Sequence, residues 1–324
     1  MHASEKENSF YGMDIDAIKR TDDCTVYKMK NPDGEGVMTS YQVFPGIELV
    51  YNDFHIPSCF QDVPPGGGIL EINHCREGRF ECAFENGAYV YMEKGDLAVN
   101  LRDNRTVTSC FPLEHYHGIA VMVNLKEAAA TLSSVLDDIS IDLYKLCGKL
   151  CPDKRCFIMR AKPEIQHIFS ELYTIPREVQ KGYFKLKVLE ILLFLSVTDI
   201  SGYDENRKYF PKKQVEAVKQ IKKYITQNMD QRFTLQELSE KFGIGLTSMK
   251  LCFKGVFGSS ILSFLKSHRM QAAALMLRQS EDSVTTVAGK AGYTNASKFA
   301  AAFREETGMS PYEFRKNYLS EWSE

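Results

Sequence analysis

Two stretches near the C-terminal end of the chain decide its fold: residues 234–257, TLQELSEKFGIGLTSMKLCFKGVF, and residues 283–303, SVTTVAGKAGYTNASKFAAAF. Each begins with a hydroxyl residue that can cap a helix, reaches a glycine, and continues with apolar residues spaced four apart. In the first stretch a glutamate follows the capping threonine by three residues, as in a capping box. Gly243 and Gly292 stand where a first helix must end in a sharp turn. Both stretches therefore predict a helix-turn-helix unit.

The segment between the two units, residues 263–278, consists of good helix formers and has an apolar stripe. It predicts one continuous helix that holds the units at a fixed separation. Two second helices on one rigid body could then enter successive major-groove segments about 34 Å, or one helical turn, apart. We expect one chain to read a DNA site that simpler repressors read with two chains.

Residues 214–316 also carry a set of apolar, aromatic, glycine, proline and basic residues at fixed spacings. They are Ile221, Tyr224-Ile225, Phe253-Lys254, Phe257-Gly258, Arg269, Ala273, Leu277, Gly292-Tyr293, Phe299, Phe303-Arg304, Gly308, Pro311 and Phe314-Arg315. In these positions the chain resembles the DNA-binding domain of the AraC-type transcription regulators. The resemblance implies sequence-specific binding to double-stranded DNA, regulation of transcription with activation commoner than repression, and RNA polymerase as a further partner.

Charge is divided unevenly along the chain. Residues 212–324 contain 17 lysines and arginines against 11 aspartates and glutamates, whereas the remainder contains 23 against 31. The near-neutral total of −2 therefore combines a basic C-terminal part with an acidic N-terminal part. Basic residues are what contacts to DNA phosphates require, although a solvated surface of mixed charge would give the same count.

The residues expected to contact DNA lie on or beside the second helix of each unit, opposite its buried stripe. They are Thr247, Ser248, Lys250, Leu251 and Lys254 in the first unit, and Asn295, Ser297, Lys298, Ala301 and Arg304 in the second. Leu251 and Ala301 occupy equivalent positions, and an apolar side chain there can pack on a thymine methyl group. The alternatives are that Leu251 packs within its own domain, that Ala301 only avoids a clash, and that the basic residues only aid solubility.

Strand signals dominate the N-terminal part from about residue 36 to residue 123. The predicted strands are residues 41–44, 47–51, 68–73, 79–84, 89–92, 96–101 and 118–124, with hairpin turns at 85–87 and 93–96. We expect an α+β multidomain protein, in which an N-terminal β-sandwich or barrel with helices after it precedes an all-α domain. The order of strands and the Lys94-Gly95-Asp96 turn resemble the cupin-like sensor domain of AraC-type regulators, closest to regulators of siderophore uptake.

Helices are predicted at residues 126–136, 141–148, 163–173 and 183–197. The apolar face of the last helix could pack on its own β-domain or pair with a second chain, and the family resemblance favours a homodimer. These patterns give three parts. Residues 1–200 form an effector-sensing and dimerisation domain, residues 201–213 a polar linker, and residues 214–324 the DNA-binding domain.

Four histidines among the strands, His55, His74, His115 and His117, are candidates to line a pocket for a small-molecule effector. His115 and His117 share a strand face, and enzymic cupins hold iron with such a pair. The acidic residue that should follow is missing from residues 118–124. We therefore predict no metal site, no cofactor and no enzymatic activity. The alternatives are a metal- or redox-sensing regulator that uses histidines or cysteines, and a metal-dependent cupin enzyme fused to a DNA-binding module.

Nine cysteines, an odd number, and the absence of a secretory signal in residues 1–30 favour reduced thiols. Cys147, Cys151 and Cys156 lie close in sequence but lack the Cys-x-x-Cys spacing of common zinc sites. The longest apolar run, residues 188–197, is too short to cross a membrane. We expect a soluble, cytoplasmic protein.

Overall fold

The computed structural model describes residues 7, 11, 15–29, 33–59, 68–84, 89–102, 106–135, 141–152, 156–200 and 210–321. The chain divides into two compact units, Met1–Tyr209 and Phe210–Glu324. Most of the predicted linker, residues 201–209, lies outside the described residues.

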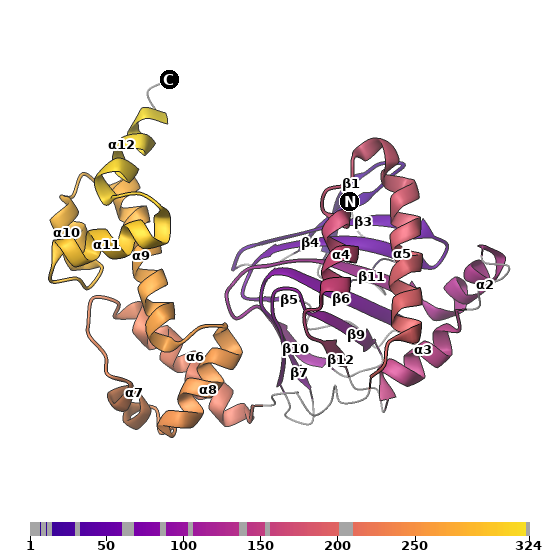
Figure 1. The fold of residues 1–324 in the computed structure, drawn as a ribbon, viewed down its shortest axis with the longest axis horizontal. Coiled ribbons are helices and arrows are strands. Elements are labelled where there is room, and N and C mark those ends of the chain that lie inside the picture. Colours follow the sequence, from indigo (N-terminus) through magenta and orange to yellow (C-terminus); the bar gives the residue numbers. More distant parts are fainter. Residues whose placement is uncertain are drawn as a thin grey trace. The chain divides into compact units, whose positions relative to one another are not determined.

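The described part of the N-terminal unit contains two antiparallel sheets (Figure 1). The larger sheet has the strand order β1 (Ile15–Arg20), β2 (Thr25–Met29), β3 (Glu35–Phe44), β4 (Ile47–His55), β11 (Tyr116–Asn124), β6 (Ile69–Gly78), β9 (Leu97–Leu101) and β12 (Phe157–Met159). The smaller sheet has the order β5 (Ser58–Cys59), β10 (Thr106–Cys110), β7 (Phe80–Phe84) and β8 (Tyr89–Met92). The predicted β-rich N-terminal fold is confirmed.

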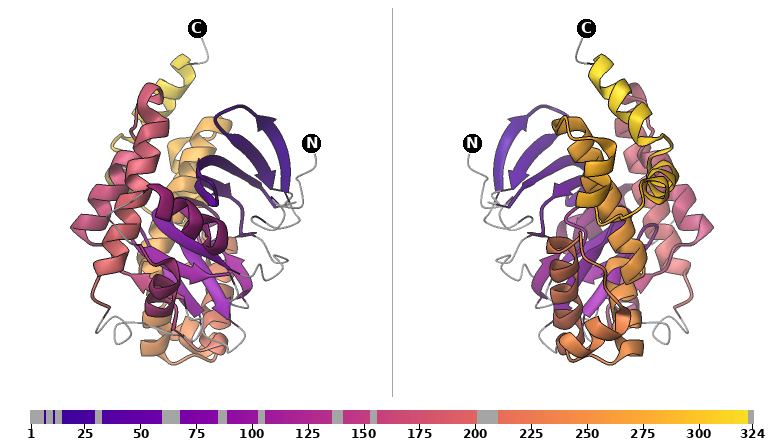
Figure 2. Two further views of the ribbon diagram at one scale, coloured as in Figure 1. Left: turned by 90° about the vertical axis from the view of Figure 1, so that its right-hand side faces the viewer. Right: turned by 90° about the vertical axis from the view of Figure 1, so that its left-hand side faces the viewer.

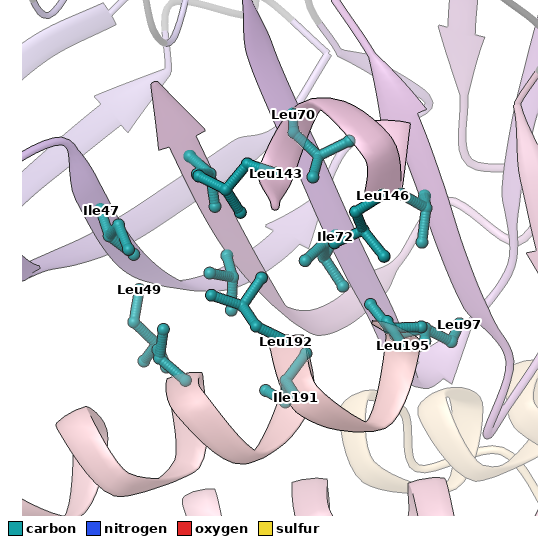
Figure 3. Packing of buried hydrophobic residues seen from close by; sticks show 14 of the residues in the cluster. Ile47, Leu49, Leu70, Ile72, Leu97, Leu143, Leu146, Ile191, Leu192 and Leu195 are labelled. Carbon is teal, nitrogen blue, oxygen red and sulfur yellow. The ribbon is translucent and has the colours of Figure 1, made fainter. Parts of the chain in front are cut away.

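Helices cover one face of the larger sheet (Figure 2). They are α2 (Leu125–Val135), α3 (Leu143–Leu150), α4 (Pro163–Leu172), the short 3₁₀ helix η2 (Arg177–Val179) and α5 (Gln180–Val197). Leucine and isoleucine side chains of the strands and helices point toward one another in this layer (Figure 3). A second apolar cluster on the opposite face includes Met92 of the smaller sheet. Because the two apolar clusters lie on opposite faces of the larger sheet, strand β11 is buried on both of its faces. Its sequence is accordingly a nearly continuous run of apolar residues.

The apolar face of α5 packs against its own sheet. Phe184, Val188, Ile191, Leu192 and Leu195 are all buried in the cluster beneath the helices. Of the two alternatives drawn from the sequence, the structure therefore supports packing within the chain for these five residues.

One predicted hairpin is wrong. Residues 93–96 do form a turn, in which the Asp96 amide donates to the Glu93 carbonyl at 2.9 Å. However, this turn connects β8 of the smaller sheet to β9 of the larger one, so the flanking strands do not pair. The Asp96 side chain is buried and accepts a hydrogen bond from Arg160 at 2.5 Å, which holds the crossover in place. The other predicted hairpin turn, residues 85–87, lies outside the described residues.

In residues 210–321, which the structure describes, the C-terminal unit has seven helices: α6 (Lys212–Gln227), α7 (Leu235–Lys241), α8 (Leu246–Phe257), α9 (Ile261–Gln279), α10 (Val284–Lys290), α11 (Ala296–Thr307) and α12 (Pro311–Glu321). The long helix α9 lies between the two helix-turn-helix units (Figure 1). Helices α6 and α8, which precede it in the chain, contact it, and so do α10, α11 and α12, which follow it. Both predicted helix-turn-helix units and the continuous helix between them are present. In the described part of the chain, none of the helices combines the length and apolar character needed for a bilayer crossing.

Candidate nucleic-acid interface

The first helix-turn-helix unit is fixed by local hydrogen bonds. The Thr234 hydroxyl accepts from the Glu237 amide at 3.2 Å, and the Glu237 carboxylate accepts from the Thr234 amide at 2.9 Å, so the predicted capping box is confirmed. The bond from the Thr234 backbone lowers the pKa of Glu237. Gly243 has a φ of +60°, and the buried Ser239 hydroxyl donates to the Ile244 carbonyl at 2.7 Å. These contacts set the angle at which α8 leaves the turn.

The second helix-turn-helix unit is fixed by the same kinds of contact. Ser283 caps α10 by accepting from the Thr286 amide at 3.1 Å, and Gly292 has a φ of +79° in the turn. The Asn295 side-chain oxygen caps α11 by accepting from the Lys298 amide at 2.9 Å. Asn295, predicted from the sequence as a DNA contact, therefore also positions the second helix of this unit.

Helices α8 and α11 each bury one face and expose the other. The buried side chains recur at intervals of three and four residues: Met249, Cys252, Phe253, Val256 and Phe257 on α8, and Phe299, Ala302 and Phe303 on α11. Because a helix turns by about 100° per residue, the residues between these lie on the opposite, open face.

All ten residues predicted to contact DNA lie on the surface of the C-terminal unit. Nine are exposed, and Ser248 is half-buried. Thr247, Leu251 and Lys254 follow one another at spacings of four and three along the outer face of α8, and the same spacing places Ser297, Ala301 and Arg304 on α11. Leu251 is 58% exposed, which excludes the alternative that it packs within its own domain.

Arg269 of α9 connects the loop that precedes the first unit with the turn of the second unit. Its Nε donates to the Met229 carbonyl at 2.7 Å, and one terminal nitrogen donates to the Gln231 carbonyl at 2.5 Å, both in the loop before α7. The guanidinium also lies 6.0 Å from the centre of the Tyr293 ring in the second turn. A Cβ atom on Gly292 would lie 2.6 Å from the Met229 carbonyl oxygen, so the loop before α7 and the turn of the second unit approach closely. Burial lowers the pKa of Arg269.

Further contacts brace this arrangement. Lys266 of α9 pairs with Glu305 of α11 at 2.7 Å, and Arg232, in the segment before α7, donates to the Thr294 hydroxyl at 3.0 Å. Sequence reasoning recognised Arg269 only as part of a family pattern, because its partners lie about 40 residues away in the chain. The result is a C-terminal unit in which α8 and α11 are held in a fixed relation.

The predicted effector histidines do not form one site. His74 is buried and stacks on Phe169 with ring centres 4.2 Å apart, and neither ring nitrogen has a hydrogen-bond partner. Burial lowers the pKa of His74 to about 4. His115 is half-buried, and its Nδ1 lies 3.1 Å from the Leu113 carbonyl oxygen. His74 thus packs among apolar side chains, and His115 contacts a neighbouring main-chain carbonyl.

The other two histidines meet across neighbouring strands. The Nε2 atoms of His55 on β4 and His117 on β11 lie 3.3 Å apart, and each lies 3.0 Å from the same Asp53 oxygen. His115, by contrast, has its ring centre 6.3 Å from that of His117. The pairing that the sequence suggested, His115 with His117, is thus replaced by one between different strands.

The cysteine cluster is buried. Cys147, Cys151 and Cys156 are each less than a tenth exposed. Burial raises the pKa of the Cys147 thiol to about 11, which disfavours the thiolate that redox chemistry and metal binding require. The geometry does not favour redox sensing at these residues.

Sequence comparisons place the C-terminal unit among known proteins. Residues 238–317 match the family model described as "Helix-turn-helix domain". The HTH-type transcriptional activator RhaR of Mannheimia succiniciproducens is 22% identical over 156 residues, which are 48% of this chain and 55% of that protein. The virulence regulon transcriptional activator VirF of Yersinia enterocolitica is 28% identical over 95 residues, 29% of this chain and 35% of VirF. The chain thus spans about half of the first relative and about a third of the second.

Solved structures give weaker likenesses. The C-terminal domain of AraT, a response regulator from Geobacillus stearothermophilus, is 26% identical, with 31% of this chain and 84% of that chain covered and a TM-score of 0.31. ToxT from Vibrio cholerae is 11% identical, with 85% of this chain and 98% of that chain covered and a TM-score of 0.28. These scores are low, so the assignment rests on the sequence matches and on the repeated motif. Residues 238–317 of the C-terminal unit are thus similar to helix-turn-helix domains, and the chain is similar to proteins named as HTH-type transcriptional activators.

Proposed function

We propose that this protein is a sequence-specific DNA-binding regulator of transcription that acts as an activator. The observation that carries the proposal is the pair of exposed faces on α8 and α11, whose equivalent residues follow the same spacing on two units that both pack on α9. Relatives named as transcriptional activators support the sign of regulation. RNA polymerase is the partner through which an activator would act.

On this proposal, α8 and α11 read DNA in two ways. Lys250, Lys254, Lys298 and Arg304 are exposed cations that can neutralise phosphates, which gives affinity without sequence preference. Leu251 and its counterpart Ala301 present apolar surface, which can pack on a thymine methyl group but cannot form the paired hydrogen bonds that select guanine or adenine.

The N-terminal unit is proposed to sense a small-molecule effector and to form the homodimer. Two observations support a separate role for this unit: it has its own apolar clusters, and it lies outside the helix-turn-helix match. A ligand that binds one arrangement of this unit better than another would shift the population presented to DNA. We further propose a cytoplasmic location, in keeping with a DNA-binding role.

The proposal can be tested with the full chain and a random pool of DNA duplexes. Repeated selection should enrich one site, and binding to that site should weaken steeply with salt. Lys254→Ala and Lys298→Ala should each lower the slope of log affinity against log salt by about 1, whereas Lys223→Ala, an exposed charge on α6, should leave it unchanged. Failure to enrich any sequence, or equal effects of all three substitutions, would refute the proposed interface.

A further inference from the structure

A cluster of metal-binding side chains lies in the N-terminal unit, on three adjacent strands of the larger sheet. Asp53 and His55 are on β4, His117 is on β11, and Glu77 is on β6. In the strand register His117 lies directly opposite Asp53 on one side and Glu77 on the other. Because residues opposite each other share a sheet face, and so do residues two apart, all four side chains project from the same face.

An irregularity in the sheet contributes to this arrangement. The register between β11 and β6 shifts between His117 and Gly118, where β6 has one more residue than its partner. A bulge of this kind reverses the facing of the residues beyond it. Glu77 is thereby brought to the face of His117, whereas Cys75 faces the apolar cluster on the other side of the sheet.

The distances suit a bound cation. The ligand atoms of Asp53, His55 and His117 all lie within 4.8 Å of one another, with the closest approaches at 3.0, 3.0 and 3.3 Å. Around a four-coordinate Zn²⁺ with bonds of about 2.0–2.1 Å, neighbouring ligand atoms lie about 3.3 Å apart. An ion placed above this triangle would reach all three atoms and keep an open position toward solvent.

The position of Glu77, the second carboxylate of the cluster, also suits a metal ion bound to His117. Glu77 Oε2 lies 3.8 Å from Nδ1 of His117, on the side of the ring that faces away from Asp53. A neutral imidazole has one N–H and can donate to only one of two carboxylates. With a metal ion on Nε2, the proton resides on Nδ1 and points toward Glu77, which is the usual outer partner of a metal-bound histidine.

We propose that Asp53, His55 and His117 form a binding site for a divalent transition-metal ion of the Zn²⁺ class, with Glu77 as a positioning residue for His117. Two imidazoles and one carboxylate favour such ions over Mg²⁺ or Ca²⁺, which prefer oxygen ligands alone. The side chains of Asp53 and His55 are 62% and 61% exposed, so an ion can enter from solvent without any rearrangement of the sheet.

The site differs from the one that the sequence suggested, and this gives a matched control. A site built on His115 and His117 would need both residues, whereas the proposed site does not use His115. His167 on α4 is a second control, since it is an exposed histidine beside a carboxylate, Glu171, at 3.8 Å.

The experiment is a titration of the full chain, freed of metal with a chelator, first with Zn²⁺ and then with Co²⁺. One ion should bind per chain, and bound Co²⁺ should give visible absorption bands of four- or five-coordinate geometry without the near-ultraviolet bands of cobalt–thiolate bonds. His55→Gln and His117→Gln should each weaken binding at least about tenfold, and Glu77→Gln less, whereas His115→Gln and His167→Gln should bind as the unaltered chain does.

Several results would overturn the proposal. They are no binding at about 100 µM metal, thiolate bands in the cobalt spectrum, equal affinity of the His55→Gln or His117→Gln variant, or an equal loss in His115→Gln. The side chains of His55, Glu77 and His167 are exposed and those of His115 and His117 are half-buried, and circular dichroism of each variant checks that it folds. No DNA is used, so the outcome is independent of the proposed function in transcription.

Discussion

Replacement of Arg269 by alanine tests whether the two helix-turn-helix units act as one rigid reader of DNA. The guanidinium forms hydrogen bonds of 2.7 and 2.5 Å to two main-chain carbonyls of the loop before α7 and lies beside the turn of the second unit. A hydrogen bond from a charged donor contributes about 1.5–3 kcal/mol, but water can replace part of it at this half-exposed position. We therefore expect Arg269→Ala to destabilise the C-terminal unit by about 2 kcal/mol in total.

The assay has two parts. Thermal unfolding should show a decrease in Tm of roughly 8 °C, since about 1 kcal/mol corresponds to at least 4 °C in a domain of this size. DNA binding should be measured on the selected site and on a duplex in which one of its two contacted segments is scrambled. Arg269→Ala should lose more affinity for the intact site than for the scrambled one, because only the intact site needs both helices in register.

Arg269→Lys is the matched control, because it keeps the positive charge but cannot reach two carbonyls with a planar fork. It should retain the salt dependence of binding and still lose part of the preference for the intact site. If Arg269→Ala melts as the unaltered chain does and loses the same factor on both duplexes, the coupling of the two units through Arg269 is refuted.

Other predictions address single features. Ala274→Pro in α9 should break the helix at a cost of about 3 kcal/mol and reduce binding to the intact site, as measured by unfolding and by anisotropy. Because burial lowers the pKa of His74 to about 4, the unfolded chain takes up a proton near pH 6.5 that the folded chain does not, so stability is lost as the pH falls from about 6.5 to about 4. His74→Leu should make urea unfolding of the N-terminal unit less sensitive to pH, by about 2 kcal/mol between pH 7 and pH 5. Replacing thymine by uracil at each position of the selected site should weaken binding at one position in each segment, and no loss at any position would end the idea that Leu251 and Ala301 contact thymine methyl groups.

The C-terminal unit could be predicted from the sequence in detail, because its signals are local. Three features depend only on residues a few positions apart, and all three are present in the structure. They are the helix cap formed by Thr234, the turn at Gly243, and the spacing of Phe299 and Phe303. The N-terminal strands between residues 36 and 123 were recognisable for a similar reason, since alternation and turn residues mark them.

What the sequence could not predict depends on contacts between distant segments. Strands β1 and β2 carry lysines and an arginine, so they lack a clean alternating pattern, and β12 is three residues long and exists only because it pairs with β9. The pairing of His55 with His117 requires the register of β4 and β11, which are 62 residues apart at this point. The contact of Arg269 with the Met229 carbonyl likewise joins segments separated by 40 residues.

On the proposed function, one C-terminal unit reads two successive segments of the major groove. The most direct measurement is protection of guanine N7 and thymine in the selected site by a fragment of residues 207–324, combined with its stoichiometry on DNA. One fragment per duplex should protect two segments about 10 base pairs apart on the same face of the helix. Protection of a single segment by one fragment, with the second protected only when a second fragment binds, would contradict the claim.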